Sequence, residues 1–541
     1  MHESASPILI YDTTLRDGAQ SEDVLFSVAD KLRITERLDE LGIDVVEGGW
    51  PGSNPKDVEY FQQVRNLQLG HARVSAFGST RRADTTAATD PILQSLLQAE
   101  TPVVTIFGKS WNLHVIKALE IPLEANLELI FESVRFLKER VETVYYDAEH
   151  FFDGFKADPE YALRTLQAAR DGGADCLVLC DTNGGASLHD IPAIVARAAT
   201  LGAPLGIHCH NDSGLAVANT LLAVEAGAVH VQGTINGLGE RCGNADLTSV
   251  IPHLALKMHK PLRLQPEQVQ SLTRVSRFVN EMANRSSQKN QPFVGASAFA
   301  HKGGIHVSAI LKDARTYEHI TPESVGNRQR VLVSEQAGRS NLFYKLKGFG
   351  IDDVEQKDPR ILQLLNDIKE LEHKGYQFDG AEASFELRAR RALGQIPDYF
   401  TLHGFRVIDE RREEENGEKL MLVSDASVKV SVGDHIEHTA AEGKGPVNAL
   451  DQALRKALTR FYANLGDMTL SDFKVRIISD GGTAAQVRVQ IESRDGNDRW
   501  GTVGTSENII AAAYQALVDA VVYKLYKDRT PALNGKSPGG V

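Results

Sequence analysis

Short apolar or β-branched runs alternate with helical segments through the first half of the chain, and this alternation limits the possible folds more than any other feature. The helical segments carry apolar residues three and four apart, as between Ser27 and Gly42, where a serine start and a glycine stop bracket the pattern. Strand alternating with helix predicts parallel strands joined by right-handed crossovers. The eight runs are ILIY at 8, IDVVE at 43, RVSAF at 73, PVVTIF at 102, TVYYD at 143, DCLVLCD at 175, PLGIHCH at 204 and VHVQGTI at 229.

Eight strand–helix units in about 240 residues match the number and length of a closed (β/α)₈ TIM barrel, in the α/β class. A doubly wound open sheet is the alternative. We favour the barrel because polar residues follow nearly all eight runs, at the end where such barrels carry their sites. These residues are Arg16 and Asp17, Glu47, Glu149, Asp181, His208 and His210, and Asn236.

The second half of the chain changes character twice. A mixed helical pattern follows the barrel and predicts helical linker subdomains. An internal repeat then appears, with strands and a helix in residues 403–463 and again in 473–526, which predicts a C-terminal α+β domain of two βββα units. The predicted boundaries are 1–265 for the barrel, 266–397 for the linker, 398–528 for the repeat domain and 529–541 for a disordered tail rich in Pro, Gly and polar residues.

Composition and charge narrow the partners and the compartment. The net charge of −13, with acidic and basic residues mixed along the sequence, disfavours nucleic acid or an anionic membrane as the main partner. The four cysteines show no CxxC spacing, which fits a reducing compartment. The N-terminus lacks the pattern of a signal peptide, and no apolar run approaches the ~20 residues that span a bilayer. We therefore expect a cytoplasmic protein.

The stretch GIHCHND places two histidines at the end of an apolar run. In a strand, His208 and His210 point to the same face, and Cys209 points to the other. In a closed barrel the eighth strand lies between the seventh and the first, so Asp17 and Asn244 reach the same mouth. Two imidazoles, a carboxylate and an amide oxygen suit a divalent ion such as Zn²⁺, Mn²⁺, Mg²⁺ or Co²⁺, with positions left open for a chelating substrate. Two hydrogen-bonded histidines at a strand end, without a metal, are the alternative.

Two further charged residues at this mouth have two interpretations each. Arg16 forms a structural ion pair, or it stabilises an oxyanion that develops on a polarised carbonyl. Glu149 is a solvated loop acid, or a group that exchanges protons with a substrate. The glycines of NGLGERCGN lack a dinucleotide-binding context and are read as backbone turns, with Glu240 and Arg241 as a structural ion pair.

Taken together, these residues give the chain a resemblance to the DRE-TIM metallolyase superfamily. More closely, it resembles the branch of 2-isopropylmalate, homocitrate and citramalate synthases. The motifs are TTLRDGAQ at 13, HCHND at 208, GLGERCGNADL at 237, AHKGGIHVSA at 300 and GKGPVNALDQAL at 443. The details EGGWPGSNPKD at 47, CDTNGG at 180 and GERCGNA are most similar to the citramalate synthase subgroup.

The resemblance implies a condensation of acetyl-CoA with a 2-oxoacid, pyruvate in the citramalate case, followed by hydrolysis of the thioester. It also implies a homodimer with shared active sites, because the linker of such enzymes reaches over the partner's barrel, and a C-terminal domain that binds an end-product amino acid, isoleucine for a citramalate enzyme. The implied roles are metal ligation by Asp17, His208, His210 and Asn244, ketone polarisation by Arg16, carboxylate binding by Thr182, and catalysis by Glu149, His306 and Tyr317 together with Arg16. Thr248 departs from relatives that have glutamate after the GNA triplet.

Other functions are weighed against this one. An amidohydrolase also uses HxH in a barrel, but on the first strand, whereas here the pair is on the seventh. A non-catalytic metabolite sensor should have lost a ligand or the arginine, and neither is missing. A retro-aldol lyase fits the barrel, yet the linker and the repeat domain fit the synthases better. Among the synthases, 2-isopropylmalate and homocitrate synthase stay open, because a hydrophobic pocket discriminates by only about 1–3 kcal/mol per methylene.

Overall fold

The chain divides into two compact units, Met1–Phe299 with Glu318–Gln329, and Ala300–Tyr317 with Arg330–Val541, and each unit is described by itself. Most of the predicted disordered tail, from residue 532 onward, lies outside the described residues. The computed structural model describes residues 7–301, 304–310, 312–331, 339–352, 354–355, 358–378, 380–413, 420–479, 482, 485–496 and 498–531.

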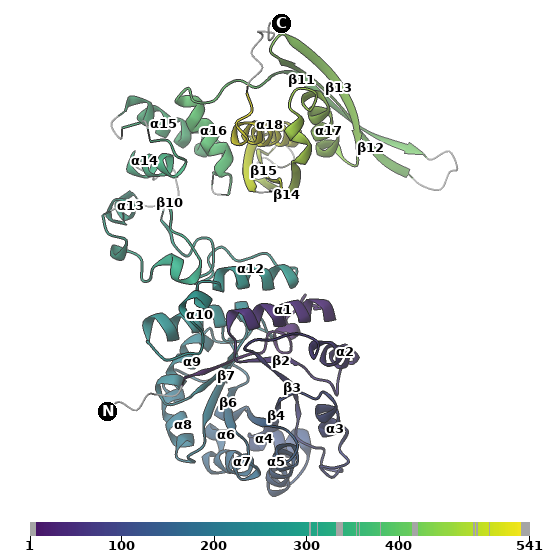
Figure 1. Ribbon diagram of the computed structural model, residues 1–541, viewed down its shortest axis with the longest axis vertical. Helices are drawn as coiled ribbons and strands as arrows, with labels where there is room; N and C mark the ends of the chain where they lie inside the picture. The colour runs from purple at the N-terminus through teal and green to yellow at the C-terminus, as the bar shows by residue number, and fades with distance from the viewer. Residues whose placement is uncertain are drawn as a thin grey trace. The chain divides into compact units, whose positions relative to one another are not determined.

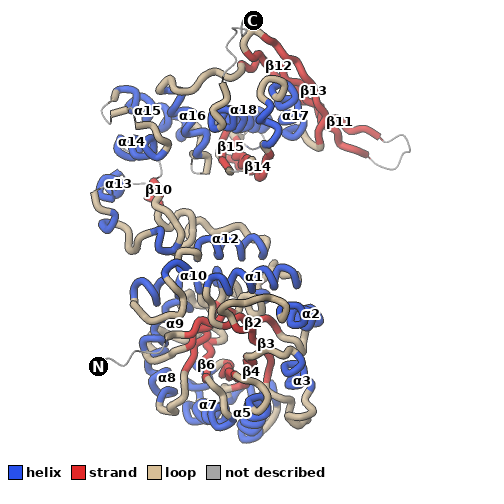
Figure 2. The backbone as a smooth tube through the Cα atoms, in the orientation of Figure 1, coloured by secondary structure: helices blue, strands red, loops and turns tan. Residues whose placement is uncertain are grey.

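The first unit is built around a closed barrel. Within residues 7–301, eight parallel strands pair in chain order, and β1 pairs with both β2 and β8 to close the ring. Helices surround the strands in Figures 1 and 2. This confirms the predicted (β/α)₈ barrel and excludes the open sheet. The strands are β1 (Leu9–Asp12), β2 (Val45–Gly49), β3 (Arg73–Ser79), β4 (Val103–Lys109), β5 (Thr143–Glu149), β6 (Cys176–Asp181), β7 (Leu205–Cys209) and β8 (His230–Gly233).

The helices of this unit begin and end where local sequence signals place them. Helix α1 starts at Ser27, which forms a capping box with Asp30, and stops at Gly42, whose φ of 87° is left-handed. The longer helices are α1 (Val28–Leu41), α2 (Pro55–Val64), α3 (Pro91–Gln98), α5 (Leu123–Lys138), α6 (Phe151–Ala157), α7 (Pro159–Gly172), α8 (Asp190–Ala199), α9 (Ala216–Glu225), α10 (Leu247–Pro252) and α12 (Leu272–Met282). Short helical turns are η1 (Gly18–Gln20), α4 (Asn112–His114), η2 (Val115–Leu119), η3 (Ile235–Gly237), η4 (His253–Lys257), α11 (Pro266–Val269) and η6 (Pro322–Val325).

Part of the predicted linker packs with the barrel. Leu272, Val275 and Val279 on α12 are buried in the same hydrophobic core as the barrel helices. The side-chain amide of Asn236, just after β8, donates to the Ser276 carbonyl at 2.8 Å. These contacts hold α12 against the end of the barrel where the eighth strand stops. The boundaries at 265 and 397 remain predictions.

The second unit contains helices with their own core and then the repeat. Leu346, Ile361 and Phe385 belong to one buried cluster that joins the three longer helices before the repeat. The elements before the repeat are β9 (Ala300–His301), α13 (Gly304–Ile310), η5 (Ala314–Thr316), β10 (Arg330–Val331), α14 (Arg339–Gly348), α15 (Pro359–His373) and α16 (Glu382–Ala392).

The two βββα units are present as predicted. In the described part of the repeat, each unit is a three-stranded antiparallel sheet followed by a helix that packs on it, and the two helices contact one another. The first unit comprises β11 (Thr401–Glu413), β12 (Leu420–Val432), β13 (His435–Gly443) and α17 (Pro446–Leu458). The second comprises β14 (Thr469–Ile477), β15 (Val487–Arg494), β16 (Arg499–Ser506) and α18 (Ile509–Lys527), with the short turn η7 (Ala463–Asp467) between the units.

Helix α18 is 19 residues long with a mean hydropathy of 1.3, so by length and composition it could cross a membrane. This differs from the expectation that no apolar run approaches the length that spans a bilayer. In the structure 61% of it is buried, and Leu517, Val521 and Leu525 lie in the core between the two repeat sheets and their helices. The burial identifies α18 as a core helix of the repeat domain.

Candidate metal centre and active site

Asp17, His208 and His210 meet at the carboxyl end of the barrel strands. Asp17 follows β1, and the two histidines come from the end of β7, where their rings point into the same space. The Nε2 atoms of the two imidazoles are 3.3 Å apart, and the Asp17 Oδ2 lies 3.3 Å from one and 3.6 Å from the other. All three residues are buried. As strand alternation predicted, His208 and His210 point to the same side, and there they form a cluster with Asp17.

The loop after β8 folds back and places Asn244 beside this cluster. Asn244 forms a bridge with His210, and the flanking backbone pairs again where the Ala245 amide donates to the Cys209 carbonyl at 2.9 Å. The side-chain amide nitrogen of Asn244 donates to the Leu238 carbonyl at 3.2 Å, which leaves its oxygen free to accept. A Cβ on Gly239 would stand 2.0 Å from that amide nitrogen, so the loop needs glycine there.

The electrostatics of the cluster favour a positive charge between the three groups. Burial would raise the pKa of Asp17, but Arg16 and the two histidines outweigh it and hold that pKa well below its usual range. Burial works to lower the pKa of His208, and the hydrogen bond and charge of Asp17 raise it nevertheless. Burial lowers the pKa of His210 to about 4. His210 is therefore uncharged at neutral pH.

Unpaired buried oxygens test whether a cation fits here. The Asp17 Oδ1 and the Asn244 Oδ1 are buried and have no hydrogen-bond partner among the described residues. Leaving such groups unpaired is costly, since each forgoes its interactions with water. Carboxylate, amide oxygen and imidazole nitrogen are all ligand types for divalent ions. The donor set fits a divalent cation, and three of its members lie within 4.8 Å of one another.

Gln232, which was not identified from the sequence, contacts the Nδ1 atom of His208. The Nδ1 of His208 is 2.8 Å from the Gln232 Oε1, and the amide nitrogen of Gln232 donates to the Asp147 Oδ1 at 3.0 Å. Burial raises the pKa of Asp147 to about 7. The sequence did carry a signal for Gln232, which is a polar residue two positions after His230 in a buried strand. Because side chains alternate along a strand, both of these residues point into the barrel interior.

Arg16 is tightly held at the mouth. Its Nε donates to the Glu47 Oε1 at 2.6 Å, and its Nη1 donates to the Asp17 Oδ2 at 3.2 Å. Its guanidinium lies 3.8 Å from the centre of the Phe77 ring, which stacks on Phe107. The ion pair read from the sequence exists, and it leaves the guanidinium fixed beside the cluster.

Glu149 and Thr182 occupy the ends of β5 and β6, at the same face of the barrel. Glu149 forms an ion pair with Lys109, its neighbour in register on β4. The Thr182 hydroxyl oxygen accepts from the His150 backbone amide at 2.8 Å, which leaves its proton free to be donated. His150 itself has a left-handed backbone with φ of 53°, an uncommon conformation for a residue other than glycine. Sequence reasoning named Glu149 and Thr182 as candidate site residues, but neither Lys109 nor His150.

His306 and Tyr317 belong to the second unit. Their rings stack with centroids 4.2 Å apart, and both side chains are exposed. The pair is thus brought together, on α13 and just after η5, and it faces solvent in the single chain. Its place in the active site stays a prediction.

The loop after β8 is also anchored by Arg241, which forms the predicted ion pair with Glu240 and makes further contacts. Arg241 contacts Glu240 at 3.1 Å. It also donates to both carboxylate oxygens of Asp212, at 2.7 and 3.1 Å, and to the Thr182 carbonyl at 2.7 Å. These contacts tie together the loops after β6, β7 and β8. Thr248, the departure from some relatives, donates to Asp246 at 2.7 Å at the start of α10.

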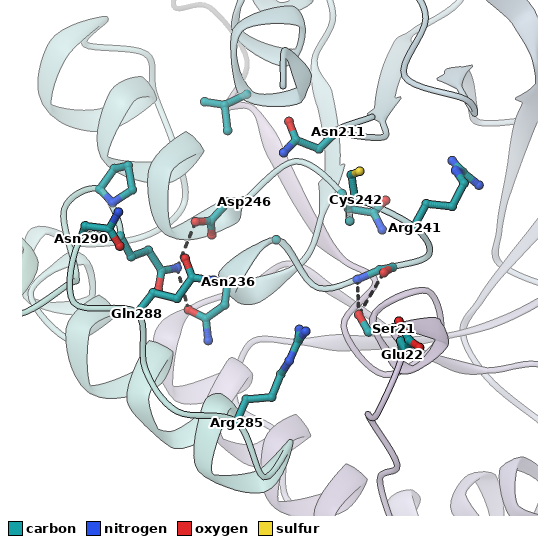
Figure 3. Close-up of a pocket in the computed structure, with 17 residues that line it drawn as sticks. Ser21, Glu22, Asn211, Asn236, Arg241, Cys242, Asp246, Arg285, Gln288 and Asn290 are labelled. Carbon is teal, nitrogen blue, oxygen red and sulfur yellow. Dashed lines mark hydrogen bonds between the residues drawn. The ribbon is translucent and has the colours of Figure 1, made fainter. Parts of the chain in front are cut away.

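A cavity of about 470 Å³ adjoins Asn244 (Figure 3). Its walls come from the turn after β1, the segment from β7 into α9, the loop after β8 and the segment 285–292, and they are mostly polar. Arg285 points into the space in Figure 3. Gln291, which also lines the cavity, donates to Asn236 and to Asp246, both at 3.1 Å. A cavity with this lining suits a ligand with several polar or anionic groups.

Comparison with known protein families divides the chain into three matched regions. The HMGL-like family model matches residues 7–279, the model described as homocitrate synthase post-HMGL domain-like matches 293–375, and the LeuA allosteric (dimerisation) domain matches 379–525. These regions follow the order of barrel, linker and repeat.

Individual relatives match over nearly their whole length. The chain is 57% identical to the (R)-citramalate synthase of Geobacter sulfurreducens, over 96% of this chain and 98% of that protein. It is 53% identical to the (R)-citramalate synthase of Aquifex aeolicus, over 97% and 99%. A probable 2-isopropylmalate synthase of Methanopyrus kandleri is 34% identical, over 95% and 97%. The similarity to the first two therefore extends through all three regions.

Proposed function

Because the chain belongs to the HMGL-like family and, within it, to the (R)-citramalate synthases, we propose that it condenses acetyl-CoA with pyruvate and hydrolyses the thioester to (R)-citramalate and CoA. The methyl carbon of acetyl-CoA loses a proton and bonds to the ketone carbon of pyruvate, whose oxygen takes up a proton. Water then cleaves the thioester and releases the CoA thiol.

The observation that carries this proposal is the buried cluster of Asp17, His208 and His210 with the free oxygen of Asn244 beside it. We propose that these four side chains hold a divalent cation, which is Zn²⁺, Mn²⁺, Mg²⁺ or Co²⁺. When bound, such an ion supplies a Lewis acid for the ketone and carboxylate oxygens of a 2-oxoacid. Imidazole ligands favour the transition metals and zinc over Mg²⁺.

Arg16 is proposed to stabilise the negative charge that develops on the ketone oxygen. The arginine is already held by Glu47, Asp17 and the Phe77 ring, so little reorganisation is needed when the charge appears. Thr182 is proposed to donate its free hydroxyl proton to the carboxylate of the oxoacid. Its oxygen already accepts from His150, which orients the hydroxyl.

The proton transfers are assigned to Glu149, His306 and Tyr317. An acetyl thioester methyl is a weak carbon acid, so a base must be held against it. Glu149 lies at the barrel mouth with Lys109 beside it, and the stacked rings of His306 and Tyr317 are exposed on the second unit, as groups would be that meet a substrate or a partner's barrel. The polar cavity beside Asn244 is proposed to receive part of acetyl-CoA.

The C-terminal repeat matches a LeuA allosteric (dimerisation) domain, which supports a dimer and a regulatory role for this region. We further propose that the active sites are shared between the subunits of a homodimer, that isoleucine is the effector and that the enzyme serves isoleucine synthesis. All four cysteines are free thiols, which supports a cytoplasmic location.

The direct test is CoA release from acetyl-CoA in the presence of pyruvate, 2-oxobutyrate, 2-oxoisovalerate or 2-oxoglutarate. We expect the highest kcat/KM with pyruvate and a product with the mass of citramalate. Pyruvate and 2-oxoisovalerate differ by two methyl groups, so the expected discrimination is of the order of 10²- to 10⁴-fold. Faster turnover of 2-oxoisovalerate would favour a 2-isopropylmalate synthase instead.

A further inference from the structure

We propose that Gln232 and Asp147 are positioning residues that select the neutral tautomer of His208 in which Nδ1 carries the proton and Nε2 can bind a cation. The inference rests on the proposed metal site and adds two residues to it. Neither touches the cation position directly. They act through His208, across the interior of the barrel.

The chain of hydrogen bonds from His208 through Gln232 to Asp147 involves three strands. His208 on β7 and Gln232 on β8 are partners in register, so their side chains lie next to each other inside the barrel. Asp147 reaches the other end of the Gln232 amide from β5. The two contacts are 2.8 Å from His208 Nδ1 to Gln232 Oε1 and 3.0 Å from Gln232 Nε2 to Asp147 Oδ1.

The donor and acceptor in each of these hydrogen bonds follow from Asp147, at the end of the chain. A side-chain amide has one accepting oxygen and one donating nitrogen, and the carboxylate of Asp147 accepts the N–H bond. The amide oxygen of Gln232 therefore faces His208, where it accepts a hydrogen bond from Nδ1. In a neutral imidazole the other nitrogen then has no proton. Its lone pair is then available for a cation held between Nε2, Asp17 and His210, because Nε2 lies 3.3 Å from the Asp17 Oδ2 and from the His210 Nε2.

Burial makes this arrangement specific. Gln232 is completely buried and Asp147 is 3% exposed, so bulk water does not compete for their hydrogen bonds. With the amide reversed, the oxygen of Gln232 would face the carboxylate oxygen of Asp147, and the nitrogen would require an accepting Nδ1. The proton of His208 would then move to Nε2 and block the cation. Groups that orient a metal-bound imidazole commonly change metal affinity by 10- to 100-fold when they are removed.

The test is the dissociation constant for Mn²⁺, measured from the electron paramagnetic resonance of free Mn²⁺ during titration of the full-length protein. We expect Gln232→Leu to weaken binding by roughly 10- to 100-fold. Asp147→Asn keeps the shape of the side chain but lets the Gln232 amide reverse, so we expect a smaller loss, of roughly 3- to 10-fold. With Co²⁺, the visible absorption band should shift in Gln232→Leu, because His208 would no longer be held in the orientation and tautomer in which its Nε2 binds the metal.

Two matched variants separate this role from general destabilisation. Asn126 is another completely buried amide, and it donates to the Lys109 carbonyl and the Tyr161 hydroxyl, both at 2.9 Å. Asp44 is a buried carboxylate that accepts from the Ile10 amide at 2.8 Å. We expect Asn126→Leu and Asp44→Asn to lower the melting temperature and leave Mn²⁺ affinity unchanged.

The outcomes divide clearly. Wild-type affinity in both Gln232→Leu and Asp147→Asn overturns the inference while the metal site stands. An absence of Mn²⁺ and Co²⁺ binding by the wild-type protein overturns the proposed metal site itself. If Gln232→Leu does not fold, the isosteric Asp147→Asn decides, because its packing is preserved.

Discussion

Arg16 and Glu47 form a hydrogen bond of 2.6 Å between Nε and Oε1, and the Glu47 side chain is completely buried. The other oxygen of Glu47 accepts from the Tyr11 hydroxyl at 2.7 Å. A buried carboxylate is costly unless it is paired on both oxygens, and here it is. Glu47 thus fixes the position of the proposed oxyanion-stabilising arginine from within the barrel.

Replacing Glu47 with glutamine should therefore impair catalysis more than substrate binding. The amide cannot hold Arg16 through a charged hydrogen bond, and we expect kcat to fall by roughly 10- to 100-fold with a smaller change in KM. Steady-state CoA release provides the measurement. Tyr11→Phe removes only the second partner of Glu47 and should cost less than tenfold, and equal losses in the two variants would contradict this role.

The close approach of Gly239 to Asn244 gives a second prediction. An alanine methyl at 239 would stand 2.0 Å from the Asn244 amide nitrogen, so Gly239→Ala should displace that side chain and weaken Mn²⁺ binding. Isothermal titration measures the effect, for which we expect at least tenfold. Gly202 also has a positive φ, of 71°, with no neighbour within 4 Å of a Cβ, so Gly202→Ala tests backbone strain alone and should leave binding unchanged.

Removal of divalent cations should abolish the reaction. After dialysis against EDTA we expect activity to disappear and to return when Mn²⁺, Co²⁺ or Zn²⁺ is added, because the proposed ketone activation requires the ion. Asp17→Asn removes one ligand charge, so the added ions should not restore it to more than about 1% of wild type. Full turnover by a rigorously metal-free preparation would be incompatible with the site.

Asp39 on α1 should make stability depend on pH. Burial would raise the pKa of this carboxyl, but backbone N–H groups of Ala72, Gly70 and His71 donate to it and hold the pKa below its usual value. A lowered folded-state pKa stabilises the fold above the unfolded pKa of about 3.9, and this contribution is lost as the pH falls through the folded value.

Asp39→Asn should therefore lower the unfolding free energy at pH 7 by on the order of 1 kcal/mol, a figure that allows for solvent screening. The difference from wild type should shrink as the pH falls through the lowered folded-state pKa of Asp39. Urea denaturation at several pH values measures it. Glu36→Gln on the exposed face of the same helix serves as control, and a difference for Asp39→Asn that grows in acid would disprove the assignment.

Several parts of this molecule could be read from local sequence. The capping serine and the glycine stop of α1 depend only on residues within the helix and its ends. The common direction of His208 and His210 depends only on strand alternation. The family motifs were equally readable, because they are short continuous stretches. These features share one property, which is that their physical cause lies within a few residues.

The sequence by itself determined the alternating elements, the repeat and the residue types at each strand end. Only the tertiary structure decided which side chains meet: Gln232 with Asp147 across the barrel, Lys109 with Glu149, and Arg241 with Asp212. Such pairs depend on barrel closure and strand register, because a one-residue shift turns every side chain to the opposite face. Local residue patterns do not encode that register, since it is selected by the packing of the whole barrel.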